Sequence, residues 1–370
     1  MVSDTQGVTG GFPFFLTGLR MPTEAPPPHV RRKRYRGTHP RKFEEKYKEL
    51  DPQKFAADVE KVIARGQTPA GMHRPICVNE ILAILHPGPG ETSLDATLGF
   101  GGHTQAIVPL LSPGGRHFAV DVDAIELPRT EARLRKLGFS EDVLVIHNMN
   151  FAGIAQLLAE ADGGFDCILA DLGVSSMQLD DPTRGFSYKN DGPLDLRLNP
   201  MRGSPASVLL QSLTVQALAQ LLTKNADEPY AELISQVIKQ CVSPILTTRQ
   251  LADVVRTALS RIPEITEHKK TLARTFQALR IAVNDEFGVL ERFLDVLPWC
   301  MKPGARVAIL AFHSGEDLRV ERAFLRYFQS GVYSSVSPEP LRPAPEEQRS
   351  NPRSTSAKLR WAIRSGQTGY

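Results

Sequence analysis

Cysteine is scarce in this 370-residue chain, and its four cysteines lie far apart. They are Cys77, Cys167, Cys241 and Cys300, so successive ones are 90, 74 and 59 positions apart. This spacing excludes the paired ligands of a zinc finger and a dense disulfide framework. It favours a reducing compartment.

The chain also lacks a long hydrophobic run and a large net charge. No stretch approaches the roughly 18 consecutive apolar residues that span a bilayer, which excludes a membrane-spanning protein. Its 44 Lys and Arg against 41 Asp and Glu leave a net charge of +3, too small by itself to indicate a polyanionic partner. With 41% hydrophobic residues and enough length for two or three domains, the composition is that of an ordinary globular protein.

Positive charge is concentrated near the N-terminus. Residues 1–30 mix Gly, Pro and Thr, and we expect them to be mostly disordered. From Arg31 to Lys48 there are nine Lys or Arg against two Glu, with three aromatic residues among them. Cations that displace counterions and aromatic rings that stack on bases suit RNA, although a solvated tail or a localisation signal has the same composition. We assign residues 1–71 to a basic, partly disordered extension.

From residue 72 the pattern alternates between strands and helices, which is typical of a parallel α/β sheet. The predicted strands cover residues 93–97, 117–120, 143–147, 165–170 and 306–312, with an edge strand over 357–363. Helices are predicted over residues 78–85, 105–111, 127–137, 270–296 and 316–328, and a mobile loop over 330–352. Consecutive amphipathic helices over 208–224, 230–241 and 248–260 indicate a helical insertion. We therefore predict an α/β domain formed by residues 72–203 and 269–370, interrupted by a helical domain at 204–268.

A glycine-rich turn, Gly99-Phe-Gly-Gly102, follows the first predicted strand and precedes a helix. Glycine lets the backbone approach a ligand closely, although a plain strand-to-helix turn can look the same. Asp121 ends the next strand, 22 residues beyond Gly99, where a carboxylate can accept both hydroxyls of a ribose. Asp123 is the competing candidate, and both acids could instead cap the following helix. The ligand is then a dinucleotide or S-adenosylmethionine, and Asp95, which would repel a pyrophosphate, favours the latter.

Asp171 ends the fourth predicted strand and opens a loop rich in Gly, Ser and Asp that extends to Arg197. This loop is long for a mere connection, although a surface turn stabilised by Ser and Asp has a similar composition. The amino nitrogen of a base has its lone pair delocalised into the ring, so its N–H groups need a hydrogen-bond acceptor. Because Asp171 is expected at the same sheet edge as the glycine turn, it is our candidate for that acceptor.

Six segments resemble the small-subunit rRNA (cytosine-N4)-methyltransferase family, the MraW or RsmH group. They are HRPICVNEIL from His73, DATLGFGGHTQAI from Asp95, DLGVSSMQLDDPTRGFSYKNDGPLDLR from Asp171, RTFQALRIAVNDE from Arg274, AFHSGED from Ala311 and NPRSTSAKLR from Asn351. The resemblance implies a Rossmann-like S-adenosylmethionine-dependent methyltransferase sheet with an inserted all-helical domain. It also implies methyl transfer to N4 of a cytidine in small-subunit rRNA near the ribosomal P site. We expect no metal site.

The resemblance carries residue roles to this chain as well. The cofactor contacts that it implies are Gly101, Gly102, His103, Asp121, Phe151, Asp171 and Gln178. The candidate catalytic residues are Asp171, Phe186, Asp191 and His313. We expect Phe186 or Tyr188 to stack on the cytosine and Arg184 and Arg197 to hold phosphates, with an ordinary loop or surface role as the alternative for each. His313 and Asp317 are expected to border the pocket, unless they serve in strand-end packing and as a helix cap.

The chain departs from the family pattern at several positions. Val122 stands where the family commonly has Arg, Ala124 and Met177 where it has Pro, and Gly315 where it has Leu. The run Ala226-Asp-Glu-Pro229 replaces a Gly-Glu-Glu run of the helical insertion. None of these changes touches the glycine turn or Asp171, so they bear on how RNA is placed and not on the methyl donor.

Three other functions are open on the sequence alone. They are a non-catalytic RNA-binding assembly factor, a dehydrogenase with the same sheet, and a methyltransferase that acts on a protein or a small molecule. We expect the partner to be small-subunit rRNA or an assembling small ribosomal subunit, and not a membrane; a homodimer is open. Because Asp4 and Glu24 are atypical of a transit peptide, we expect a cytoplasmic protein, or one of an organellar matrix or stroma if the source is eukaryotic.

Overall fold

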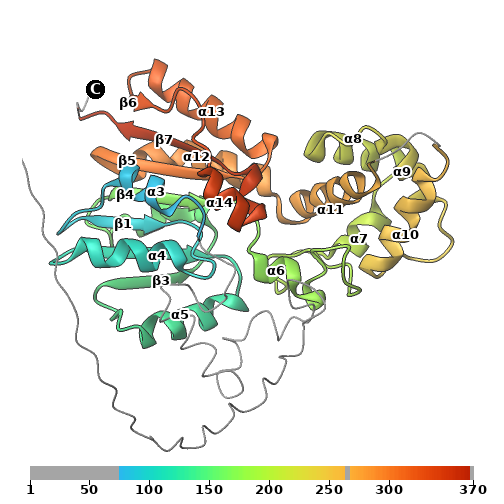
Figure 1. Cartoon of the computed structure of the whole chain (residues 1–370), viewed down its shortest axis with the longest axis horizontal. Coiled ribbons are helices and arrows are strands. Elements are labelled where there is room, and N and C mark those ends of the chain that lie inside the picture. Colours follow the sequence, from blue (N-terminus) through green and yellow to red (C-terminus); the bar gives the residue numbers. More distant parts are fainter. Residues whose placement is uncertain (1–74, 263–266, 367–370) are drawn as a thin grey trace, which may run out of the picture. The chain divides into compact units, whose positions relative to one another are not determined.

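The structure, a computed structural model, describes residues 75–262 and 267–366. Within them the chain forms a seven-stranded sheet in the order β3-β2-β1-β4-β5-β7-β6 (Figure 1). The strands are β1 Thr92–Asp95, β2 Arg116–Asp121, β3 Leu144–Asn148, β4 Phe165–Asp171, β5 Met301–Ala311, β6 Tyr333–Val336 and β7 Lys358–Arg364. The basic segment 31–48 and the rest of the expected extension, up to residue 71, lie outside the described residues.

The first five strands are parallel, and β7 is antiparallel to both β5 and β6. Asp95 of β1 pairs with Ala119 of β2 on one side and with Leu169 of β4 on the other. The chain proceeds from β1 outward through β2 and β3, and then continues on the opposite side of β1 with β4 and β5. The carboxyl ends of β1 and β4 therefore form the switch point where open α/β sheets bind ligands. This topology confirms the expected fold class.

Both faces of the sheet are covered by helices. Successive side chains of a strand point to opposite faces, and in β4 Ile168 and Ala170 pack in one hydrophobic cluster while Cys167 and Leu169 pack in another. The covering elements are α3 Val78–Leu85, α4 Gly102–Ile107, η2 Val108–Leu111, α5 Glu126–Lys136, η3 Phe151–Leu157, α12 Glu286–Cys300 and α13 Ser314–Gln329. Burial on both faces explains the continuous apolar runs of β4 (Cys167–Ala170) and β5 (Val307–Ala311).

Five further helices form a separate hydrophobic cluster. They are α7 Ala206–Ser212, α8 Val215–Ala226, α9 Ala231–Lys239, α10 Thr248–Leu259 and α11 His268–Asn284. This cluster also contains Phe186 and Leu196 from the preceding loop, and it reaches Leu279 in α11. The hydrophobic core of the helical part thus extends beyond residues 204–268 on both sides.

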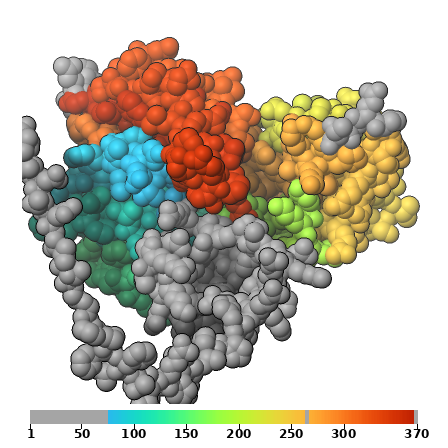
Figure 2. Space-filling view, in the orientation of Figure 1, coloured from blue at the N-terminus to red at the C-terminus, as the bar shows by residue number. Residues whose placement is uncertain are grey.

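The remaining elements are short. They are α6 Ser176–Asp180, η4 Pro182–Arg184, α14 Pro345–Ser350 and η5 Pro352–Ser356. Glu347 of α14 accepts a hydrogen bond from the backbone N–H of Cys77 at 3.1 Å, so α14 lies beside the start of α3, as the red and blue surfaces of Figure 2 show. In the described part of the chain, no helix has the length and apolar character needed to cross a membrane.

Four local predictions are wrong. The helix expected over 208–224 is two helices, because Leu213 is extended and the side chain of Thr214 caps α8. The helix expected over 270–296 is also two, because Asp285 adopts a left-handed conformation with φ of 50°. The loop expected over 330–352 contains β6 and α14. Because β6 adds beyond β7, the strand expected at 357–363 is not the edge of the sheet.

Candidate functional site

The glycine turn lies between the end of β1 and the start of α4, at the switch point of the sheet. Gly101 has a φ of 71°, a conformation that side chains other than glycine rarely adopt. A Cβ atom on Gly102 would lie 2.4 Å from Cγ of Pro75, so a larger residue would displace the neighbouring chain. Gly101 is therefore required by its backbone conformation and Gly102 by its contact with Pro75, and both let the turn pack closely on its neighbours.

Asp121 holds this turn from the end of β2. Its Oδ2 accepts the N–H of Gly99 at 2.7 Å, and its Oδ1 accepts the N–H of Asp123 at 2.8 Å. Burial raises the pKa of Asp121 to about 6, against the effect of these two backbone donors, and the nearby Asp123 and Asp95 raise it further. Each carboxylate oxygen keeps one more acceptor position, so the half-buried side chain can still accept hydroxyl groups.

Asp123 has no such free positions. It is 1% exposed, and its Oδ2 accepts hydrogen bonds from Gln178 at 2.7 Å and from Arg184 at 2.9 Å. Its Oδ1 accepts the N–H groups of Ile125 at 3.0 Å and of Glu126 at 3.2 Å, at the start of α5. Of the two acids that the sequence left in competition, only Asp121 thus has acceptor capacity left for a ribose.

Asp171, at the end of β4, faces His103 of the glycine turn. Asp171 Oδ2 lies 3.5 Å from His103 Nε2, and the backbone N–H of Asp171 donates to Thr97 Oγ1 at 2.6 Å. Asp171 Oδ1 and His103 Nε2 are both buried and have no hydrogen-bond partner among the described residues. Buried polar atoms are nearly always paired, so these two atoms mark a place where a polar ligand fits.

Asp95 does not face this place. It is 1% exposed, and its carboxylate accepts hydrogen bonds from the N–H of Thr97 at 3.0 Å and from the hydroxyl of Thr104 at 2.8 Å. Burial raises the pKa of Asp95. Both of its oxygens are engaged inside the protein, so Asp95 does not contact a ligand directly. Because hydrogen bonds to neutral donors do not remove its charge, the expected repulsion of a pyrophosphate stays a prediction.

Two other expected cofactor contacts have clear local partners. The ring of Phe151, at the start of η3, packs edge to face on Phe293 with 5.1 Å between centroids, and it remains half-buried. Gln178 lies in a capping box with Ser175, in which each side chain accepts the other residue's N–H. The amide nitrogen of Gln178 also donates to Asp123 Oδ2, which fixes this side chain beside the turn that follows β2.

The loop residues expected to contact RNA are largely inside the protein. Phe186 is 4% exposed in the core of the helical part, so in this structure it offers no face to a base. Arg184 is 6% exposed and bound to Asp123, so it does not hold a phosphate. Tyr188 is half-buried against Phe276, and Arg197 pairs with Asp195 at 2.8 Å.

The other expected residues differ in their surroundings. Asp191 is exposed and lies 3.4 Å from Arg249 of α10. His313 Nε2, just beyond β5, lies 3.2 Å from Glu316 Oε1. Asp317 is buried and accepts hydrogen bonds from Lys358 and Arg360, both at 2.6 Å. It ties α13 to β7 and is neither a simple helix cap nor exposed at a pocket.

Among residues 75–262 and 267–366, two groups of side chains bring three metal-ligating atoms within 4.8 Å of one another, Cys77-Glu80-Glu347 and Glu286-His313-Glu316. In the first group, burial raises the pKa of the Cys77 thiol to about 12, which disfavours the thiolate that a metal needs. In the second group, Arg280 donates to both oxygens of Glu286 at 2.8 Å. The donor chemistry of neither group favours a cation.

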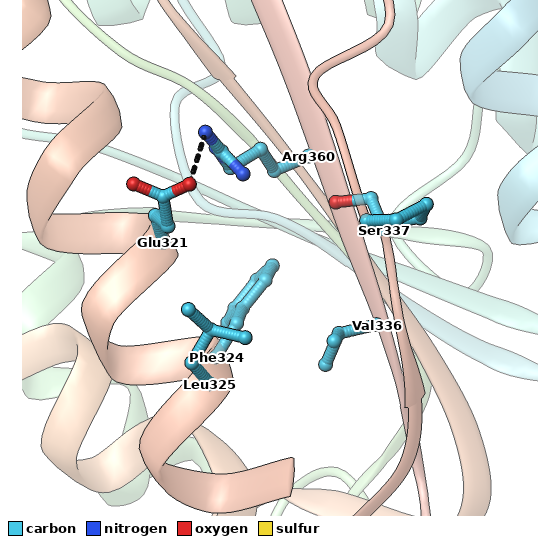
Figure 3. Close-up of a pocket in the computed structure, with 7 residues that line it drawn as sticks. Glu321, Phe324, Leu325, Val336, Ser337 and Arg360 are labelled. Atoms are coloured by element: carbon cyan, nitrogen blue, oxygen red, sulfur yellow. Dashed lines mark ion pairs between the residues drawn. The ribbon is translucent and has the colours of Figure 1, made fainter.

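A small surface pocket lies between α13 and the strands β6 and β7 (Figure 3). The two charged residues that line it, Glu321 and Arg360, are paired with each other at 3.0 Å. Arg360 is also held by Asp317. The charges that line this pocket are therefore satisfied within the protein.

Sequence reasoning missed the buried pair of Asp123 and Arg184. The two residues are 61 positions apart, and the loop around Arg184 has the composition of a surface turn. The sequence carries no signal that decides between a buried and an exposed turn, because an Arg followed by Gly and Phe inside a polar loop is compatible with both.

The chain matches the MraW methylase family over residues 70–365. It is 53% identical over 340 residues to the ribosomal RNA small subunit methyltransferase H 2 of Alkaliphilus metalliredigens, and the alignment covers 90% of this chain and 97% of that protein. It is 52% identical to the ribosomal RNA small subunit methyltransferase H 1 of Lachnoclostridium phytofermentans, with 94% of this chain and 96% of that protein covered. The corresponding protein of Agathobacter rectalis, named methyltransferase H 1, is 49% identical, with 91% and 98% covered.

Proposed function

The chain belongs to the MraW methylase family, and from that premise we propose that it transfers a methyl group from S-adenosylmethionine to N4 of a cytidine in small-subunit rRNA, near the ribosomal P site. The names of its relatives support small-subunit rRNA as the substrate. The choice of the cytidine N4 atom and of the region near the P site rests on the sequence motifs. The pair of unpartnered buried atoms on Asp171 and His103 is the observation that carries the proposal.

The residues at the switch point fit S-adenosylmethionine. Gly101 and Gly102 let the turn after β1 pack closely on its neighbours at the switch point, and Asp121 has two remaining acceptor positions for the ribose hydroxyls. Phe151 and Gln178 would complete the cofactor site as an apolar wall and a polar contact. The cofactor supplies an electrophilic methyl group on a sulfonium. The protein must position the base, activate its amino group and take up the proton.

Asp171 would act on the amino group of the cytosine. The N4 lone pair is delocalised into the ring, and a hydrogen bond from N4–H to Asp171 Oδ1 increases its availability for attack. The new N–C bond forms as the C–S bond breaks, and the nitrogen then loses one proton. Asp171 Oδ1, a buried acceptor with no hydrogen-bond partner among the described residues, can take up that proton. A strong base is not needed, because the proton leaves after methyl transfer; positioning supplies much of the acceleration.

The cytidine must reach this place out of its stack. Sequence-specific RNA recognition acts on unstacked bases, and enzymes that modify a base take it out of the helix. Tyr188 and Arg197, which are half-buried on the loop after Asp171, are the residues of the expected RNA contacts that keep an exposed part.

The test is transfer of labelled methyl groups from S-adenosylmethionine to small ribosomal subunits that lack the modification, and to the free rRNA, followed by nucleoside analysis. We expect N4-methylcytidine in the RNA. The Asp171→Asn variant should lose activity by about 100-fold or more, as expected for removal of a positioned acceptor. The matched control is Asp253→Asn, which changes an exposed acid on α10 and should leave the rate unchanged.

Label in another nucleoside would overturn the choice of the N4 atom. Label in protein, or a signal that survives RNase treatment, would assign the activity to another substrate. Full activity of Asp171→Asn would refute its role at the amino group.

A further inference from the structure

Arg184 is a buried cation that joins two parts of the site. Its Nη1 donates to Asp123 Oδ2 at 2.9 Å, and its Nη2 donates to the carbonyls of Leu198 at 2.8 Å and of Arg197 at 3.2 Å. Its guanidinium carbon also lies 5.6 Å from the centroid of the Phe186 ring. One side chain therefore contacts the turn after β2 and both ends of the segment 184–198.

On the cofactor side, the hydrogen bonds continue without interruption. The N–H of Asp123 donates to Asp121 Oδ1 at 2.8 Å, and Asp121 Oδ2 accepts the N–H of Gly99 in the glycine turn at 2.7 Å. Gln178, an expected cofactor contact, donates to the same Asp123 oxygen as Arg184 does. A ligand that fixes Asp121 therefore fixes the backbone that carries Asp123.

On the other side, the segment 184–198 is pinned as a closed loop. The N–H of Leu196 donates to the carbonyl of Arg184 at 3.2 Å. Asn284, at the end of α11, accepts the N–H of Leu198 at 2.7 Å and donates to the carbonyl of Leu196 at 2.8 Å. The positions of Tyr188 and the other loop residues thus depend on where Arg184 is held.

Stability alone does not explain a charged pair at this place. Asp123 and Arg184 are 1% and 6% exposed, and removing two charges from water costs about as much as their attraction returns. Well-packed apolar residues would often stabilise such a position equally well. The planar guanidinium instead supplies a fixed geometry, because its N–H groups hold three acceptor oxygens in set positions.

We infer that the Asp123–Arg184 pair couples the cofactor site to the segment 184–198, so that cofactor and RNA bind cooperatively, with Arg184 as the positioning residue. Ribose hydroxyls on Asp121 restrain the turn from Asp121 to Asp123, and Arg184 passes that restraint to the RNA-contacting segment. Because coupling between binding sites is reciprocal, bound RNA tightens cofactor binding by the same factor. The inference rests on the proposed function only for the identity of the RNA. The restraint that a bound cofactor places on the segment 184–198 does not depend on it.

The experiment uses the full chain and S-adenosylhomocysteine, the demethylated product, so that no turnover occurs. Its affinity is measured by calorimetry with and without a saturating small-subunit rRNA fragment, and the RNA affinity with and without saturating S-adenosylhomocysteine. For the wild type we expect both affinities to increase by the same factor of about five or more. The Arg184→Lys variant keeps the positive charge but loses the planar set of N–H donors. In this variant the factor should fall to below two, while S-adenosylhomocysteine alone still binds.

The matched control is Arg326→Lys. Arg326 lies on α13, where its exposed side chain pairs with Asp295, outside the cofactor site and the segment 184–198. This variant should keep the wild-type coupling factor. A coupling factor in Arg184→Lys equal to that of the wild type would overturn the inference, and so would an equal loss in both variants.

A measurement on the wild type alone tests the inference even if a variant does not fold. Hydrogen exchange of the amides of residues 184–198 should slow when S-adenosylhomocysteine is added in the absence of RNA. If the compound binds but exchange in this segment does not change, the inference is wrong. If exchange slows but the methylated nucleoside is not N4-methylcytidine, the inference stands and the proposed function fails.

Discussion

Replacing Asp121 by Ala tests the cofactor site most directly. The carboxylate is expected to accept the two ribose hydroxyls while it holds the N–H groups of Gly99 and Asp123. A hydrogen bond to a charged group contributes about 1.5–3 kcal/mol. The variant should therefore bind S-adenosylhomocysteine about 10-fold to 150-fold more weakly at pH 7.5.

The pH dependence gives a second, independent signature. Burial raises the pKa of Asp121 to about 6, and the ionised form is the stronger acceptor for hydroxyl groups. At pH 7.5 nearly all of the wild type is ionised, whereas at pH 5 only about one molecule in eleven is. Wild-type affinity should thus fall by about tenfold between these pH values through this group, and Asp121→Ala should lack that component.

Calorimetry at pH 5.0 and pH 7.5 measures both effects. The matched control is Thr130→Val, because the Thr130 hydroxyl donates to the carbonyl of Gly99 at 2.7 Å and its loss loosens the same turn without removing the acid. This control should keep the pH dependence. Wild-type affinity in Asp121→Ala, or the same pH dependence in both proteins, would refute the assignment of the ribose to Asp121.

Three further predictions concern the RNA segment, the loop and the sheet. Deletion of residues 1–48 should weaken RNA binding and reduce its dependence on salt without changing affinity for S-adenosylhomocysteine; an unchanged salt slope in a filter-binding assay would contradict this. Phe186→Ala should lower the free energy of unfolding by about 3 kcal/mol, measured by urea denaturation, because the ring is in the core. Asp317→Ala should cost about 3 kcal/mol, because it leaves Arg360 buried with one partner fewer. Burial opposes ionisation of Asp317, but its bonds to Arg360 and Lys358 outweigh it and lower its pKa, so its stabilising effect should persist above its usual pKa and disappear as pH falls through the lowered value.

Much of the sheet could be predicted because local pattern and burial agree there. The segments 165–170 and 306–312 are mostly hydrophobic because both faces of β4 and β5 are covered. Such short apolar runs predict buried strands. That Asp121 and Asp171 lie at the same end of the sheet, on either side of β1, follows from parallel strands alone. Those two positions were therefore accessible from the sequence.

Other features depend on contacts that no local pattern contains. The break at Asp285 interrupts a helical periodicity that continues on both sides of it. The strand β6 has only four residues, of which one is fully buried, and it exists because β7 offers it a partner. Phe186 lies in a loop that is polar in composition, and its burial is decided by the helices α7 to α11, which come later in the chain.

The choice between Asp121 and Asp123 shows why spacing was insufficient. Both acids lie near the end of β2, and the Val at position 122 removes the arginine that the family commonly has beside them. The charge on the buried Asp123 still needs a cation, and Arg184 supplies it from another part of the chain. This pairing fills Asp123. Asp121 has backbone donors only, so burial keeps its pKa raised and it keeps acceptor positions for a ligand. The residue that sequence analysis assigned to phosphate is thus the one that decides which acid is available to the cofactor.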